Sequence, residues 1–292
     1  MTRSRPAALP LDLAYDAQGR GPAVVFLHGF AGGRGQWHTY LPLVAAAGFR
    51  AYAVDLPGHG QSPPLTTRPA SALAWAETVH AWIDAHIPPP VHLVGHSLGG
   101  YLALAYAARA ASRVASLTLF APLTAGQAIR WPARLWVRVG NLAPWLPERW
   151  PPGVATLLRV AYWFYPDAWH MRPSQRARRV AEVAGMSPRA VWALGRVPDI
   201  RPRVAGLPVR TWVVGGARDR VLDPASYTVL GELLPHSRVW LLPHAGHIPH
   251  LTAAETLQQA LVRWLQGHAP AASPQAARTS AGNTSPAGPR ST

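Results

Sequence analysis

The chain alternates between continuous apolar runs and segments with helical periodicity. The runs that predict strands lie at residues 23–27, 51–55, 91–95, 117–120, 209–214 and 239–242. The segments that predict helices lie around residues 37–47, 72–86, 98–111, 224–234 and 253–266. Strands that are apolar on both faces are typical of a parallel sheet covered by crossover helices. The pattern therefore predicts an α/β fold with a mostly parallel central sheet flanked by helices.

The alternation stops between residues 123 and 205. Prolines divide this stretch into short helical pieces, and it holds seven of the 13 tryptophans and 13 arginines against four acidic residues. We expect a helical insertion, with the α/β core formed by 11–122 and 206–267. Residues 268–292 are mainly Ala, Pro, Ser, Thr and Gly, and such a composition cannot offset the entropy of ordering. They predict a disordered tail.

The composition limits the chemistry. The 292 residues include 28 arginines, no lysine, no cysteine and 13 acidic residues, for a formal net charge of +15. The lack of cysteine excludes a thiolate nucleophile, a disulfide framework and a Cys-ligated metal site. The charge indicates either a polyanionic partner or the arginine-rich usage of a GC-rich coding sequence. No basic motif interleaved with aromatic residues forms a known module, so we expect no nucleic-acid binding.

The lengths of the apolar runs also indicate where in the cell the protein is expected. Met1–Pro10 has no apolar stretch of the kind found in a secretory signal, and no run approaches the roughly 18–20 apolar residues of a spanning helix. We expect a cytoplasmic protein without a transmembrane segment. The tryptophan-rich basic insertion leaves peripheral contact with a membrane surface open, and the oligomeric state is not predicted.

The strongest motif lies in residues 91–100. A buried strand leads into Gly95-His-Ser97-Leu-Gly99 and then directly into a helix. A serine on such a tight strand-to-helix turn is strained and exposes its hydroxyl, and small residues two before and two after it avoid backbone clashes. Ser97 is therefore the candidate nucleophile, and a serine that caps the helix N-terminus is the alternative.

A serine nucleophile needs a base, and the base needs an acid to orient it. The chain order that accompanies this turn is Ser, acid, His. Asp219, in the loop after the strand at 209–214, is the candidate acid. Asp223 precedes Pro224 like a helix cap and is the alternative acid. His247, which follows the strand at 239–242 and stands beside Gly246, is the candidate base.

Three histidines near the last strand also suggest a zinc site. His244, His247 and His250 lie within seven residues, but no carboxylate nearby completes a ligand set. We expect no metal and no cofactor, with His244 and His250 as loop neighbours of the base.

An anionic tetrahedral intermediate needs two main-chain donors. The candidates are the amide of Leu98, after the nucleophile, and the amide of Phe30, in the glycine-rich loop at 28–33. A phosphate loop would need a lysine, which the chain lacks. A dinucleotide site at Gly95–Gly100 would need an acidic residue on a strand about 20 residues later, and none stands there.

Four motifs together resemble the α/β-hydrolase fold superfamily over roughly residues 11–267. They are His28-Gly-Phe30, Asp55-Leu-Pro-Gly-His-Gly-Gln-Ser62, Gly95-His-Ser-Leu-Gly99, and Asp219 with Gly246-His247. The resemblance implies that Asp55 and His59 shape a loop. It also implies that 123–205 is a helical cap, inserted after the sixth strand of the family's sheet, here the strand at 117–120. Serine at the turn disfavours the epoxide-hydrolase and haloalkane-dehalogenase branches.

The implied activity is hydrolysis of small-molecule carboxylic esters through an acyl-enzyme. Ser97 would attack the carbonyl, His247 would take and return the proton, and Asp219 would hold the imidazole. The motifs are also similar to those of C–C bond hydrolases and of a menaquinone-pathway cyclohexadiene-carboxylate synthase, a lyase with the same triad. These are the alternatives. A binding module with a degraded triad is disfavoured because all three residues are present.

The predicted cap raises two questions about substrate. Trp131, Trp136, Trp163 and Trp169 either line an apolar acyl pocket or only pack between helices. The arginines of the cap either meet an anionic substrate or belong to solvated helix faces. The run Arg176, Arg178, Arg179 favours solvated faces.

Overall fold

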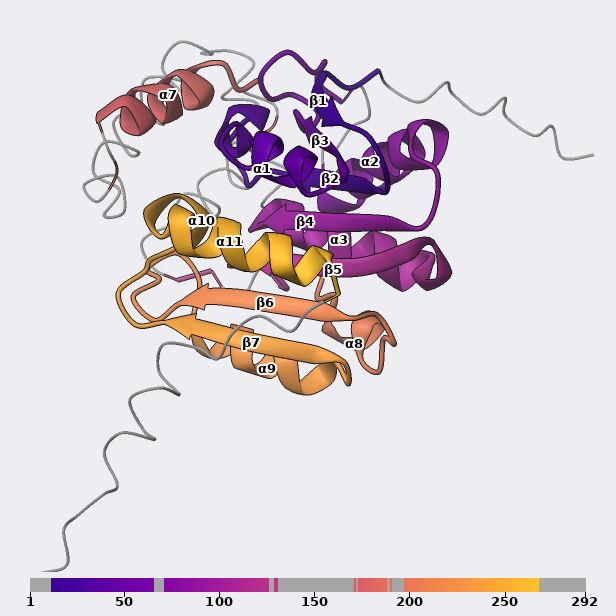
Figure 1. The fold of residues 1–292 in the computed structure, drawn as a ribbon. Coiled ribbons are helices and arrows are strands. Elements are labelled where there is room, and N and C mark those ends of the chain that lie inside the picture. Colours follow the sequence, from indigo (N-terminus) through magenta and orange to yellow (C-terminus); the bar gives the residue numbers. More distant parts are fainter. Residues whose placement is uncertain are drawn as a thin grey trace, which may run out of the picture.

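The computed structural model describes residues 12–65, 71–125, 129–130, 171, 173–187, 190 and 197–267. A seven-stranded sheet with the order β1-β3-β2-β4-β5-β6-β7 forms the centre of this part (Figure 1). Its strands are β1 Tyr15–Gly19, β2 Ala23–Leu27, β3 Arg50–Val54, β4 Val91–His96, β5 Val114–Phe120, β6 Thr211–Gly216 and β7 Ser237–Leu242. Only the pairing of β1 with β3 is antiparallel in the described sheet. The predicted mostly parallel sheet is therefore confirmed.

Helices cover both faces of this sheet. One face carries α1 (Leu41–Ala46) and α11 (Ala254–Leu265), and the other carries α2 (Ala72–His86), α3 (Leu98–Arg109), α8 (Arg201–Val204) and α9 (Ala225–Leu233) (Figure 1). The remaining described helices are η1 (Arg34–Trp37), η2 (Ala111–Arg113), α7 (Pro173–Ala184) and α10 (Pro249–Thr252). The result is a three-layer arrangement of helices, sheet and helices.

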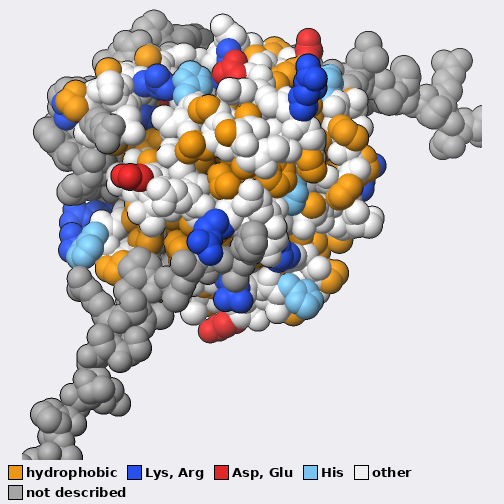
Figure 2. Space-filling view, in the orientation of Figure 1, with side chains coloured by type: hydrophobic (Ala, Val, Ile, Leu, Met, Phe, Trp, Pro, Cys, Tyr) orange, Lys and Arg blue, Asp and Glu red, His pale blue; other side chains and the backbone are white. Residues whose placement is uncertain are grey.

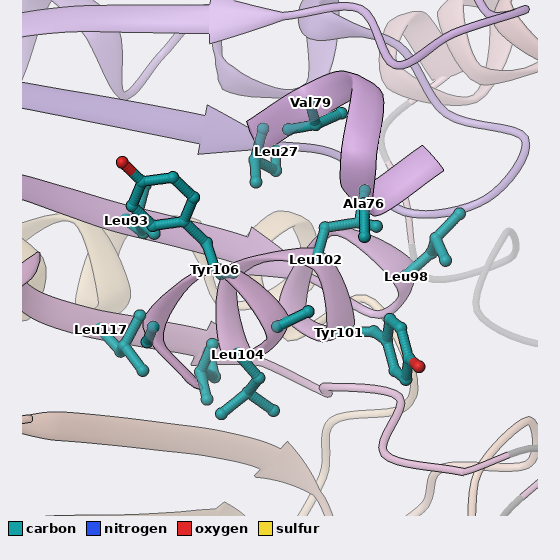
Figure 3. Close-up of a cluster of buried hydrophobic side chains, with 14 of the residues drawn as sticks. Leu27, Ala76, Val79, Leu93, Leu98, Tyr101, Leu102, Leu104, Tyr106 and Leu117 are labelled. Carbon is teal, nitrogen blue, oxygen red and sulfur yellow. The ribbon is translucent and has the colours of Figure 1, made fainter. Parts of the chain in front are cut away.

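Each face of the sheet has its own apolar core. On one side α3 packs Leu102 and Tyr106 against the sheet and α2, in a cluster that includes Leu27, Leu93 and Val79 (Figure 3). These residues are buried, and each buried leucine contributes about 2 kcal/mol to stability. The opposite core is aromatic, with Phe26, Trp37, Tyr40, Phe120, Trp212 and Trp264. The centre of the sheet is thus rigidly held on both sides.

The parallel strands end level with one another. In the register of the sheet, Leu27 pairs with Gly95, His96 with Phe120, and Phe120 with Val214. The residues that follow these strands therefore gather at one edge of the sheet, where sites in open α/β sheets form.

Two elements differ from the sequence prediction. The helix expected at 37–47 is two pieces, η1 and α1, because Pro42 has no amide to continue an α-helical ladder from residue 38. The strand β1 was not predicted, since four of its five residues are exposed and it lacks an apolar run.

The predicted cap and tail lie mostly outside the described residues. Of the cap, the structure describes 123–125, 129–130, 171, 173–187, 190 and 197–205, and α7 lies beyond the edge where the parallel strands end (Figure 1). The tail at 268–292 is outside the described part. The boundaries 123–205 and 268–292 stay predictions.

Candidate active site

The turn between β4 and α3 has the strained geometry expected for Ser97. Its φ of 50° lies in the left-handed region, which a residue with a Cβ seldom adopts. A Cβ on Gly95 would stand 2.5 Å from the Gly99 carbonyl oxygen, and a Cβ on Gly99 would stand 2.2 Å from the Leu27 carbonyl oxygen. The Ser97 side chain makes no capping hydrogen bond with α3. Ser97 is thus the N-terminal cap residue of α3 by position, but its hydroxyl is not used for capping and faces His247 instead.

The three residues of the candidate triad meet at the edge where the strands end. The Ser97 hydroxyl lies 3.0 Å from His247 Nε2, and His247 Nδ1 lies 2.8 Å from Asp219 Oδ2. A carboxylate can only accept, so the Nδ1 of His247 carries the proton and Nε2 can accept from the Ser97 hydroxyl. All three side chains are largely buried, at 9%, 1% and 7% exposed for Ser97, Asp219 and His247. The geometry is that of a nucleophile, a base and an orienting acid in line.

Asp219 is held as a carboxylate by several donors. Its Oδ1 accepts from the amides of Val221 and Leu222 at 2.7 and 2.9 Å, and its Oδ2 also accepts from the Tyr227 hydroxyl. Burial pushes the pKa of Asp219 upward, but His247 and these hydrogen bonds outweigh it and hold the pKa below its usual value. The Asp219 carboxylate is therefore negatively charged and can act as the counter-ion when His247 takes up a proton.

Asp223 does not reach this line of contacts. It is exposed, and its side chain accepts from the Ala225 amide at 3.1 Å at the start of α9. This contact is typical of a residue at the start of a helix. The carboxylate of Asp223, the alternative acid, is therefore used in a local turn and does not contact His247.

Tyr227 is a site residue that the sequence did not reveal. It is fully buried on α9, eight residues after the carboxylate that its hydroxyl contacts. The sequence feature that relates to Tyr227 is Gly215, because a Cβ there would lie 2.0 Å from the Tyr227 ring. A paired glycine at the end of a strand predicts close packing but not the residue that packs.

The loop after β2 lies directly against the nucleophile. A Cβ on Gly29 would stand 3.2 Å from the Ser97 Cβ. Within the described part of the chain, neither the Phe30 amide nor the Leu98 amide is used in a hydrogen bond. Both amides are thus available, as an oxyanion hole requires.

Two neutral histidines hold that loop on either side of Phe30. His28 donates from Nδ1 to the Gly29 carbonyl at 2.7 Å and accepts the Leu56 amide at Nε2. His59 accepts the Ala31 amide at Nε2 and donates from Nδ1 to the Pro57 carbonyl. Burial is the main reason that the pKa of each ring falls to about 3. The contacts fix both tautomers and clamp the backbone around the Phe30 amide.

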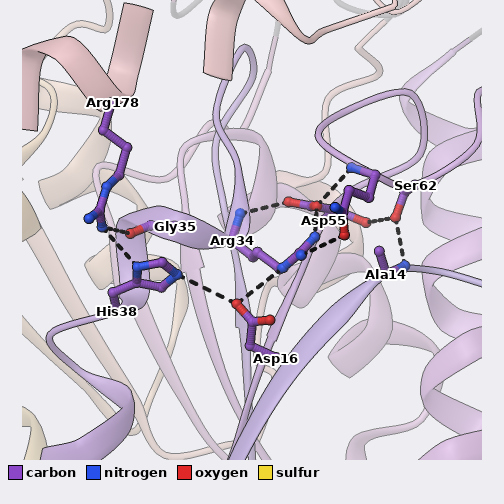
Figure 4. Close-up of polar contacts among 9 residues, drawn as sticks. Ala14, Asp16, Arg34, Gly35, His38, Asp55, Ser62 and Arg178 are labelled. Atoms are coloured by element: carbon purple, nitrogen blue, oxygen red, sulfur yellow. Dashed lines mark hydrogen bonds and ion pairs between the residues drawn. The ribbon is translucent and has the colours of Figure 1, made fainter. Parts of the chain in front are cut away.

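Asp55 organises the segment that carries His59. It accepts from the Arg34 and Gln61 amides at 2.7 and 3.0 Å, pairs with the Arg34 guanidinium, and is 2% exposed (Figure 4). Ser62 donates to the Asp55 carbonyl oxygen at 2.6 Å. These contacts agree with the loop-shaping role that the family resemblance implies.

The arginines of α7 differ in exposure: Arg178 is exposed, as expected, whereas Arg179 is buried. Arg178 donates to the Gly35 carbonyl and to His38 Nδ1 (Figure 4). Arg179 is 5% exposed and pairs with Glu182 at 2.6 Å. Burial raises the pKa of Glu182. At Arg179 the expectation of a solvated side chain is wrong, because this side chain is buried and paired with Glu182.

The other two histidines of the loop have different surroundings. His250 is buried with its Nε2 3.0 Å from the Gln36 side chain, whereas His244 is exposed. Among the residues that the structure describes, no cluster of His, Cys, Asp and Glu could hold a metal ion. Trp131, Trp136, Trp163 and Trp169 lie outside the described residues.

Comparison with known proteins identifies the family. Residues 24–259 match the alpha/beta hydrolase family. The chain belongs to the alpha/beta hydrolase family. The pimeloyl-[acyl-carrier protein] methyl ester esterase of Methylococcus capsulatus is 30% identical over 84% of this chain and 95% of the relative. The esterase of the same name from Chromobacterium violaceum is also 30% identical, over 89% of this chain and all of the relative. These matches identify the protein as a hydrolase.

Solved structures of other hydrolases share the fold. The enol-lactonase of Burkholderia xenovorans superposes with a TM-score of 0.73 at 22% identity, over 87% of this chain and 96% of that one. An esterase from Thermogutta terrifontis gives a TM-score of 0.71 at 22% identity, over 89% and 96% of the two chains. No helix among the described residues of this hydrolase is long and apolar enough to cross a bilayer.

Proposed function

We propose that this alpha/beta hydrolase cleaves carboxylic esters of small molecules through an acyl-enzyme. The observation that carries the proposal is the unbroken line of contacts from Asp219 through His247 to the Ser97 hydroxyl, at 2.8 and 3.0 Å. The names of the esterase relatives supply the reaction class.

The mechanism follows from the direction of these hydrogen bonds. Ser97 Oγ attacks the ester carbonyl as its proton moves to His247 Nε2, and Asp219 balances the charge of the imidazolium. The carbonyl oxygen becomes an anion that accepts from the Phe30 and Leu98 amides. The tetrahedral intermediate collapses, and the alcohol leaves with the proton from His247. Water, deprotonated by His247, then attacks the acyl-enzyme and releases the acid.

Methyl esters of acyl chains are the first substrates to test. The relatives from Methylococcus capsulatus and Chromobacterium violaceum are named for the methyl ester of a pimeloyl group on acyl-carrier protein. We propose a medium-length acyl ester for this enzyme, either free or on a carrier protein. The two forms are separated by comparing kcat/KM on the same acyl methyl ester with and without the carrier.

The test of the activity combines an assay with a label. Purified protein is assayed on p-nitrophenyl esters of graded chain length, and a fluorophosphonate probe reports the reactive serine. We expect turnover and labelling by the wild type and neither by Ser97→Ala. A lack of Ser97-dependent turnover at every length overturns the esterase proposal, and the C–C hydrolase and lyase alternatives would then be assayed.

A further inference from the structure

The loop that carries His247 is anchored on the side that faces β6. The Arg218 amide donates to the Ala245 carbonyl at 3.0 Å, and the Ala217 amide donates to the Leu242 carbonyl at 2.9 Å. A Cβ on Gly216 would lie 2.2 Å from the Gly246 carbonyl oxygen, so the loop sits tightly on the end of β6. The nucleophile, however, follows β4, which is separated from β6 by β5. These contacts hold the loop of His247 on β6 but do not fix its distance from β4. A further contact is therefore needed between this loop and the strand that carries Ser97.

His96 makes that connection. Its Nε2 lies 2.9 Å from the main-chain carbonyl oxygen of His247. A carbonyl oxygen only accepts, so the Nε2 of His96 carries a proton and donates it. His96 is 3% exposed and is the residue immediately before Ser97. One dipeptide thus contacts His247 twice, at its main chain through His96 and at its ring through Ser97.

The surroundings of His96 fix the state of its ring. Burial is the main cause that lowers its pKa well below the usual value, and the neighbouring His250 and His247 rings add to the effect. The Nδ1 of His96 has no hydrogen-bond partner in the described part of the chain. A Cβ on Gly29 would stand 2.5 Å from that Nδ1. The ring is therefore neutral and protonated at Nε2, and its Nδ1 side packs against the loop that carries Phe30.

We propose that His96 is a positioning residue, which holds the His247 main chain through its Nε2–H and thereby sets the separation between His247 Nε2 and Ser97 Oγ. The proposal rests on the proposed function, since this separation matters because a proton crosses it. A misplacement of about 1 Å at a reacting group can lower a rate by about 100-fold. The hydrogen bond of His96 controls such a displacement without touching the substrate.

The test replaces His96 by two residues whose side-chain amides differ in length. In His96→Gln the side-chain amide nitrogen stands as far from the backbone as Nε2 of histidine, whereas in His96→Asn it falls one carbon short. His92→Asn, on the same strand, is the control, because His92 contacts Ser116 Oγ and not the loop of His247. The readouts are kcat and KM on the best ester, the rate of fluorophosphonate labelling of Ser97, and the melting temperature.

We expect His96→Asn to lower kcat and the labelling rate by about 10- to 100-fold while KM stays within about twofold. His96→Gln should restore both rates to within about threefold of the wild type, and His92→Asn should leave them unchanged. Equal rates in the Asn and Gln variants overturn the proposal. A loss confined to the melting temperature overturns it as well, because a purely structural role has that result.

A further readout does not depend on catalysis. In nitrogen-15 spectra of the histidine rings of the wild type, assigned with His96→Gln, we expect His96 to be neutral and protonated at Nε2 from about pH 6 to pH 8. A ring that carries its proton on Nδ1 overturns the proposal whatever the activity. If the wild type cleaves no ester but is labelled, the esterase proposal fails and the labelling rates still decide the role of His96.

Discussion

At the scale of single residues, the candidate site depends on which carboxylate the base contacts. Asp219 accepts from His247 and from two main-chain amides, whereas the Asp223 carboxylate accepts from the Ala225 amide in the turn before α9. The two residues stand four positions apart in one loop and have the same side chain. They therefore form a matched pair for mutation.

We expect Asp219→Asn to lower kcat on the ester by about 10³- to 10⁴-fold, because an amide cannot hold the imidazole in the tautomer that accepts the serine proton. Asp223→Asn should retain nearly full activity, since only a local turn is affected. Steady-state kinetics of the two variants check this. Full activity in Asp219→Asn together with its loss in Asp223→Asn would reassign the acid.

The sequence predicted the residues whose roles depend on local motifs. Ser97 stands out by the glycines on either side, and His247 and Asp219 by their place after successive strands. Tyr227 and His96 could not be found in this way. His96 contacts His247, which lies 151 positions later in the chain, and Tyr227 on α9 contacts a carboxylate eight positions earlier. Neither contact leaves a periodic trace in the sequence.

At the scale of elements, the approach of α3 to the sheet is set by glycines. Gly99 lies where α3 passes over the end of β2, and a Cβ there would stand 2.2 and 2.6 Å from the carbonyl oxygens of Leu27 and His28. Both obstacles are backbone atoms, which do not move without shifting the strand or the loop that carries Phe30. The same contact therefore sets stability and site geometry.

Gly99→Ala should lower the free energy of unfolding by about 1–3 kcal/mol and reduce ester turnover more than tenfold, because α3 must move away from β2. Gly185→Ala is the matched control, as a Cβ there would meet only ordinary contacts at 3.6 Å or more. Urea denaturation and the ester assay measure the two effects. Equal stability of the two variants would show that α3 does not need the glycine.

Helices and strands could be predicted where the apolar pattern of the sequence matches the faces that are buried in the fold. The helix expected at 72–86 coincides with α2, and the strand expected at 23–27 coincides with β2. β1 escaped prediction because it lies at the edge, where its exposed residues carry no apolar period. The helix expected at 37–47 was broken by Pro42, whose effect on the ladder outweighed the apolar spacing.

At the scale of the whole molecule, some of the arginines pair with acidic residues within the fold. Arg34 pairs with Asp55, Arg179 with Glu182, and Arg201 with Asp199. On the face shown in Figure 2, the basic side chains of the described residues lie among apolar and acidic ones.

The buried histidines make the whole fold sensitive to acid. Burial lowers the pKa of His28 and His59 to about 3 and of His80 and His92 to about 4, and it also lowers those of His96 and His250. The unfolded chain binds these protons near pH 6.5, whereas the native state does not. Stability is therefore complete above about pH 6.5 and is lost as the pH falls toward the folded values.

We expect each such histidine to remove about 1.4 kcal/mol of unfolding free energy per pH unit between about pH 6.5 and pH 4. Urea denaturation at about pH 7.5, 6.5 and 5.5 measures the slope. His59→Gln should make the slope shallower by one proton. An unfolding free energy that is constant over this range would contradict the assignment of neutral buried rings.

The candidate triad is also spread far along the chain, with Ser97 and His247 separated by 150 positions. During synthesis, the strand and turn of the nucleophile can form early, but the base leaves the ribosome only after β7 has been made. Contacts of such long range are slow to close. A nascent or truncated chain that ends before residue 247 lacks the base. Ser97 therefore becomes reactive only after β7, the last strand, has been added to the sheet.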